Sequence, residues 1–161
     1  MKRCMVGVGV AVAAMVASVV PVAAAGGISG CALVTKKEVS RILGARVVHA
    51  RNAARTDAGD QACTYITKRF DSDFLEQSGS PIQLLLEWGP ITDSLRGQYE
   101  GSEAIEGLGD AAYDLGFGRV VALSGGQSVQ ATVENSEAPA PKLAKKAQKA
   151  IKLALPRLPT G

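Results

Sequence analysis

An uncharged N-terminal run divides this chain more sharply than any other feature of its sequence. Lys2 and Arg3 are followed by valine, alanine, methionine and glycine, with no charged residue from Cys4 through Cys31. A cationic start, an apolar stretch and an exit of small residues are the layout of a secretory signal peptide. The sequence therefore predicts a signal peptide over residues 1–25.

The same run permits two other interpretations. About 20 apolar residues can span a bilayer, so a retained anchor is one alternative, although the run is dominated by small residues and has no aromatic or cationic far boundary. In addition, Ile28-Ser29-Gly30-Cys31 resembles the lipobox of bacterial lipoproteins, in which the cysteine is acylated. Cleavage after residue 25 predicts a secreted, extracellular protein, whereas lipidation of Cys31 predicts a membrane-anchored lipoprotein.

Residues 26–161 are expected to form one small domain, because their 136 residues suffice for a single core. Two cysteines, Cys31 and Cys63, lie in this part of the chain. In an oxidising compartment two such cysteines usually pair. Closing a loop of about 33 residues contributes roughly 3–4 kcal/mol in the chain-entropy model. The cysteines therefore predict a structural disulfide, with lipidation of Cys31 as the alternative.

Helix signals flank a series of strand signals. A capping box at Thr35 and Glu38 predicts a helix over 35–43, and the stretch from Pro139 to about Ala154 predicts a second. The strands expected between them are 46–50, 63–67, 82–88, 111–115, 119–123 and 128–134. This order indicates an α+β fold: an antiparallel sheet of five or six strands, with a short N-terminal helix and a C-terminal helix packed on one face.

Several short motifs occur in a fixed order along the chain. They are Cys31-Ala32-Leu33-Val34-Thr35, Glu38-Val39, Leu43-Gly44, Cys63-Thr64-Tyr65, and the run from Ile105 to Ala112 that contains Gly-Leu-Gly-Asp-Ala. In this series the sequence resembles a group of small exported or lipid-anchored actinobacterial domains of unknown function. The resemblance spans most of residues 31–158. It implies that the two cysteines pair, and it implies no activity.

Residues for chemistry are scarce. His49 is the only histidine, so a Ser-His-Asp triad would need it, yet no nucleophile-elbow sequence is present. Gly107-Leu108-Gly109-Asp110 lacks the remaining residues of a phosphate-binding loop and predicts a turn. Five acidic residues lack the spacing of a calcium loop. These are Asp57, Asp60, Asp71, Asp73 and Glu76. No catalytic residue, metal or cofactor is therefore predicted.

The C-terminal helix is the most regularly patterned element, with apolar residues on one face and lysines on the other. The lysines are Lys142, Lys145, Lys146, Lys149 and Lys152. One interpretation is an electrostatic contact with acidic wall polymers, anionic lipid headgroups or an acidic protein. The other is a core-packing helix with solvated lysines. No aromatic residue interleaves with the lysines, so nucleic acid is not expected as a partner.

Trp88 and Phe117 are the candidates for an exposed aromatic contact. The expected function is a secreted or envelope-associated, non-enzymatic domain that binds a ligand or partner, such as an envelope component or an exported protein. The first alternative is an inhibitor or accessory subunit that uses residues 70–80 as an exposed loop. The second is an unrecognised hydrolase, which a deep pocket with two converging carboxylates, or His49 facing a serine, would favour.

Overall fold

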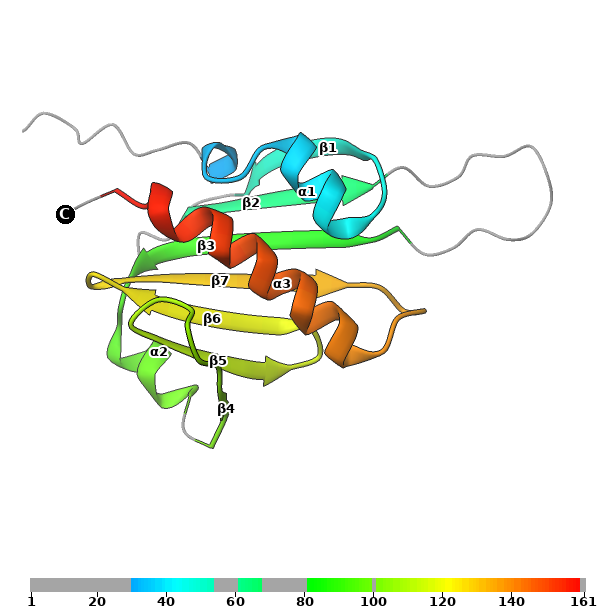
Figure 1. Cartoon of the computed structure of the whole chain (residues 1–161). Coiled ribbons are helices and arrows are strands. Elements are labelled where there is room, and N and C mark those ends of the chain that lie inside the picture. The colour runs from blue at the N-terminus through cyan, green and yellow to red at the C-terminus, as the bar shows by residue number, and fades with distance from the viewer. Residues whose placement is uncertain (1–29, 54–60, 68–80, 100, 160–161) are drawn as a thin grey trace, which may run out of the picture.

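A computed structural model describes residues 30–53, 61–67, 81–99 and 101–159 of the chain (Figure 1). The strands are β1 (Val47–Ala53), β2 (Gln61–Thr67), β3 (Gln83–Pro90), β4 (Glu103–Ala104), β5 (Ala111–Gly116), β6 (Arg119–Ser124) and β7 (Gln127–Glu134). They form one sheet in the order β1-β2-β3-β7-β6-β5-β4, and every pair is antiparallel.

The helices lie mainly on one face of this sheet. Their bounds are η1 (Gly30–Ala32), α1 (Lys36–Leu43), α2 (Asp93–Gly97), α3 (Ala140–Ala154) and η2 (Leu155–Arg157), where η marks a 3-10 helix. Figure 1 shows α1 over β1 and β2, and α3 running across the strands beside it. The α+β class, the antiparallel sheet and the C-terminal helix are confirmed.

The expected number of five or six strands is too low. β4 has two residues, both exposed, and it lies between the strands that the sequence predicts at 82–88 and 111–115. Two residues give no alternating pattern, so hydrophobic periodicity does not detect such a strand. Its pairing with β5, Glu103 opposite Asp114 and Ala104 opposite Tyr113, makes it the seventh strand and one edge of the sheet.

β3 and β7 pair near the middle of the sheet, although three other strands lie between them in sequence. After β3 the chain passes α2, reaches the far edge as β4 and returns strand by strand to β7. Leu84 pairs with Val133 and Leu86 with Ala131. Because β7 ends level with the turn between β5 and β6, α3 begins beside that turn, where the Gly118 carbonyl accepts from the Val133 amide at 3.0 Å.

The core lies between the sheet and the two covering helices. Alternate residues of each strand point to this face, as the period of two requires. The buried set on the central strands is Leu84, Leu86, Trp88, Val129, Ala131 and Val133. From α3 it includes Leu143, Ala147, Ala150 and Ile151. Burial of each large apolar side chain stabilises the fold by about 1.5–3 kcal/mol.

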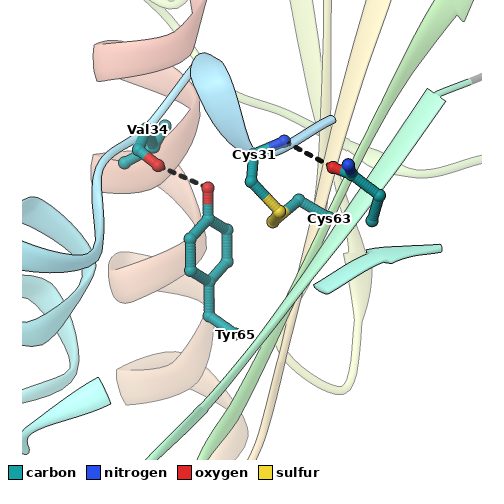
Figure 2. Close-up of a disulfide and its surroundings, with 5 residues drawn as sticks. Cys31, Val34, Cys63 and Tyr65 are labelled. Atoms are coloured by element: carbon teal, nitrogen blue, oxygen red, sulfur yellow. Dashed lines mark hydrogen bonds between the residues drawn. A yellow bond between two sulfur atoms is a disulfide. The ribbon is translucent and has the colours of Figure 1, made fainter. Parts of the chain in front are cut away.

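The segment before α1, residues 31–34, is linked to β1 and β2 by a disulfide and by hydrogen bonds. Cys31 and Cys63 form a disulfide with their Cα atoms 5.0 Å apart, which confirms the predicted pairing (Figure 2). The Cys31 amide donates to Asn52 Oδ1 at 3.1 Å, and the buried Tyr65 hydroxyl donates to the Val34 carbonyl. A cysteine sulfur in a disulfide has no valence left for a lipid thioether, so this pairing and lipidation of Cys31 are mutually exclusive.

The segment after α3 contacts the start of α1 and the residues before it. The predicted capping box is present: the Glu38 amide donates to Thr35 Oγ1 at 3.3 Å, and the Thr35 amide donates to the Glu38 carboxylate at 2.8 Å. Arg157 donates to both oxygens of that carboxylate, at 2.6 and 2.9 Å, and to the Leu33 carbonyl at 2.8 Å. Chiefly because of the Arg157 hydrogen bonds, the pKa of Glu38 falls from 4.5 to about 2.

The Gly107-Leu108-Gly109-Asp110 segment is a structural turn, as predicted, before β5. Leu108 is buried in the core, and the Asp110 carboxylate accepts from the Gly125 amide at 2.9 Å. Gly109 has φ +70°, and a Cβ there would lie 2.5 Å from the Leu123 carbonyl oxygen. The motif therefore holds the β4–β5 connection against the sheet. Gly109 allows the close approach, and the Asp110 carboxylate supplies a hydrogen bond.

Candidate functional site

The two faces of α3 have opposite characters. The predicted apolar face is buried: Leu143, Ala144, Ala147, Ala150, Ile151 and Ala154 all contact the core. The lysines lie around the opposite side of the helix. Because the buried residues are mostly alanines, α3 lies close against β7 and β6, and the lysines form the outermost layer of the domain on this side.

The five predicted lysines do not share one role. Lys146 is half-buried, and its Nζ donates to the Leu43 carbonyl at 2.7 Å, which ties α3 to the end of α1. The other four are exposed: Lys142, Lys145, Lys149 and Lys152. We call these four the α3 lysine face. Within the described ranges their amines make no hydrogen bond and no ion pair, and Arg157–Glu38 is the only ion pair found there.

A trough runs along α3 on the side away from α1. It consists of two adjoining hollows of about 400 Å³ each, which share Lys145 and Gln148 on the helix side. The opposite wall is built by β4, β5, the connection between them and the turn after β5, and it includes Glu103, Ile105, Glu106, Leu108, Asp114 and Phe117. We call this feature the α3 trough. It joins segments that are far apart in sequence, because the meander brings β4 and β5 beside α3.

The two walls of the α3 trough carry opposite charges. Lys145, Lys149 and Lys152 stand on the helix wall, and three carboxylates stand on the strand wall. These carboxylates are Glu103, Glu106 and Asp114. No amine of the helix wall is within ion-pairing distance of a carboxylate in the described part of the chain. Both sets of charges therefore remain available along the rim of the α3 trough.

Phe117 stands at one end of the α3 trough, beside the first turn of α3. It is 90% exposed, the only large apolar side chain so exposed among the described residues. It occupies the two-residue turn between β5 and β6, and both turn residues have positive φ, +51° at Phe117 and +78° at Gly118. Such turns favour Asn-Gly, so a phenylalanine here is unfavourable both for the backbone and for solvation. The predicted exposure of Phe117 is confirmed.

Trp88 was predicted to be exposed, and that prediction is wrong. The side chain is 4% exposed and belongs to the core. It continues the alternation of Leu84 and Leu86 along β3, so it points towards the helices, while Gln83 and Glu87 point to the other face. The alternation was readable in the sequence and outweighs the general tendency of single tryptophans to mark contact surfaces.

The other face of the sheet carries a smaller hollow of about 180 Å³ between β3, β7 and the α2 segment. The polar side chains that β3 and β7 contribute to its lining are already hydrogen-bonded within the sheet. Gln130 Nε2 donates to the Glu87 carboxylate at 3.0 Å, and Ser128 Oγ donates to the Gly89 carbonyl at 3.2 Å. Glu87 is its only carboxylate among the described residues, so it is not a pocket with two converging acids.

The remaining candidates for chemistry are not brought together. His49 is exposed on the edge strand β1, opposite Ile66, and its imidazole ring makes no hydrogen bond to any described residue. The five acidic residues considered for a metal, and the loop 70–80, lie outside the described residues. Among the described residues no group of histidine, cysteine and carboxylate side chains is arranged to hold a metal ion.

Tyr99, which sequence reasoning did not single out, is buried beside α2. Its ring stacks on Tyr113 of β5 with centroids 5.2 Å apart. Burial, reinforced by Tyr113, raises its pKa to about 12, and its hydroxyl has no hydrogen-bond partner among the described residues. The stack closes the end of the sheet behind β4, on the side away from the α3 trough.

Comparison with protein-family models, curated proteins and solved structures finds no match to this chain. Across the described residues, no helix has the length and apolar character needed to cross a bilayer. Fold and site together define a disulfide-linked α+β domain with a cationic helix beside a charged trough.

Proposed function

We propose that this chain is an exported domain that binds an anionic partner on the α3 lysine face. Export is supported by the cationic start and the uncharged run before Cys31, and by a disulfide that oxidising compartments preserve. The partner is an acidic component of the cell envelope or an acidic exported protein. The role is one of binding, without covalent chemistry.

The observation that carries the proposal is the difference between the four lysines of the α3 lysine face and two neighbouring cations, one on α3 itself and one just after it. Lys146 and Arg157 are engaged by carbonyl and carboxylate oxygens of the fold. The four amines of the α3 lysine face have no such partner within the described ranges. Four like charges within about 15 Å of helix, at a rise of about 1.5 Å per residue, create a positive potential that attracts anions.

Direct measurement of polyanion binding tests the proposal. The probe is fluorescent poly-L-glutamate, titrated with the mature protein at physiological and at raised salt. The variant K142Q/K145Q/K149Q/K152Q removes the α3 lysine face. The matched control K37Q/R41Q/R46Q/R51Q removes four exposed cations from α1, β1 and their connection, so both variants lose the same charge.

We expect the α3 variant to bind at least about tenfold more weakly and the control to change by less than about twofold. Raised salt should weaken wild-type binding, because exposed charges are screened beyond about 10 Å at 0.1 M salt. Equal losses in the two variants would show that only net charge matters, and would overturn the proposal.

A further inference from the structure

We infer that the α3 trough binds an extended polypeptide segment with charges of both signs, its acidic side chains facing α3 and its basic side chains facing the β4–β5 wall. This inference rests on the proposed function, since three of the four lysines of the α3 lysine face stand on one wall. It adds the chemical class of the partner: a bipolar strand of another protein.

The dimensions of the α3 trough suit a short strand. Between Pro141 and Lys152, which line its two ends on the helix side, α3 rises by about 16 Å. An extended chain advances about 3.3 Å per residue, so about five residues fit. The two hollows share Lys145 and Gln148, so a segment that lies along this side of α3 passes both.

The helix wall is suited to carboxylates. Lys145, Lys149 and Lys152 follow one another at spacings of four and three residues, so their stems lie along one side of α3. Gln148 lies between them and offers an amide that can donate to a peptide carbonyl.

The strand wall is suited to cations. Glu103 and Asp114 are direct cross-strand partners, and like charges directly opposite each other destabilise a sheet. Asp114 uses one oxygen to accept from the Gly116 amide at 2.8 Å, and neither acid pairs with a cation of the described chain. A basic side chain of a partner placed here would relieve this repulsion, with Glu106 further along the same wall.

An extended strand presents successive side chains to opposite sides, so alternating acids and bases match the two walls. A uniform polyanion meets the same lysines but is repelled by the three carboxylates. A membrane is flat and does not enter the hollows. Phe117 at the end of the α3 trough provides an apolar contact for a residue that follows the charged segment.

The probes for the test are three fluorescent peptides with blocked ends. One is the alternating hexapeptide Glu-Lys-Glu-Lys-Glu-Lys, and one is its block isomer Glu-Glu-Glu-Lys-Lys-Lys, which has identical composition and net charge. The third is an all-glutamate hexapeptide. Binding is measured by fluorescence anisotropy with the mature, disulfide-bonded protein.

We expect wild type to bind the alternating peptide about tenfold more tightly than its block isomer. In the variant E103Q/E106Q/D114N this preference should disappear, while the all-glutamate peptide binds more tightly because the repelling wall is neutral. The matched control D93N/E134Q/E137Q removes three exposed carboxylates elsewhere and should keep the preference. Thermal unfolding of each variant verifies its fold.

The two proposals fail in different ways. Equal binding of the alternating and block peptides, with polyglutamate binding still dependent on the α3 lysine face, overturns the bipolar strand and leaves the proposed function standing. Polyglutamate binding that ignores the α3 lysine face overturns both. Tighter binding to phosphatidylglycerol vesicles than to any peptide, lost in F117S, would make the partner a membrane and also overturn the inference.

Discussion

The two flanks of α3 use their charges differently. On the flank that meets α1, Lys146 and Arg157 donate to backbone carbonyls, and Arg157 also pairs with Glu38. A disulfide links the segment before α1 to β2 nearby. On the flank that meets β4 and β5, cations and carboxylates line one trough without pairing within the described chain. The first flank uses its charges for stability, whereas the charges of the second remain available for a partner.

The disulfide offers the strongest test of this comparison. In C31A/C63A the loop across a sequence separation of 32 is no longer closed, and we expect the free energy of unfolding to fall by about 3–4 kcal/mol. Urea unfolding, followed by the fluorescence of the buried Trp88, measures the loss. The quadruple lysine variant of the α3 lysine face should change by less than about 1 kcal/mol. A larger loss there than in the cysteine variant would reverse the assignment of the two flanks.

Two adjacent lysines allow a closer comparison. Lys146→Met removes a donor to the Leu43 carbonyl and should lower the free energy of unfolding by about 1 kcal/mol. Lys145→Met, one residue earlier, removes an exposed amine and should stay within about 0.5 kcal/mol of wild type. Equal effects of the two substitutions in parallel urea titrations would contradict a structural role specific to Lys146.

Phe117 should be replaceable with a gain in stability. Asn adopts positive φ more readily and leads type I′ turns, so Phe117→Asn is expected to raise the free energy of unfolding by about 0.5–1 kcal/mol. Calorimetric unfolding gives the value, with Phe117→Ala as the control that removes the ring without improving the turn. A loss of stability in F117N would show that the ring packs on the domain and is not reserved for a partner.

The smallest expected effect concerns pH. The lowered pKa of Glu38 means that its ion pair contributes stability above about pH 4.5, and this contribution is lost as the pH falls towards 2. Because the pair is partly exposed, Glu38→Gln should lower Tm by only about 2 °C at pH 7. The difference from wild type should vanish near pH 2. A gap in Tm that is independent of pH would assign the effect to the capping box instead.

Local features of this fold were predictable because a few neighbouring residues determine them. The capping box of α1 and the apolar face of α3 both depend on residues within a few positions of one another. The disulfide was predictable from the number of cysteines in residues 26–161 and from the oxidising compartment that the signal peptide predicts. The alternation of buried and less buried residues along β3 also indicates that Trp88 is buried. The expectation that Trp88 is exposed disregards this alternation.

The α3 trough was not predictable, because it depends on long-range pairing. Strand propensities do not show that β7 pairs with β3, and only that pairing places Asp114 and Lys145 around one hollow. β4 is too short for a pattern, so Glu103 appeared to lie in a connection. Likewise, nothing local distinguishes Lys146 from its neighbours, since its partner lies 103 residues earlier.

The contact of Arg157 with Leu33 has a practical consequence for handling the domain. Both ends of the described chain leave from one corner, while Phe117 lies beside the first turn of α3, about 22 Å of helix away. A tag, a bead or a host protein attached beyond either end of the described chain is therefore connected to the domain far from the Phe117 turn. The domain can be immobilised, or inserted into a loop of another protein, with the Phe117 turn facing outward.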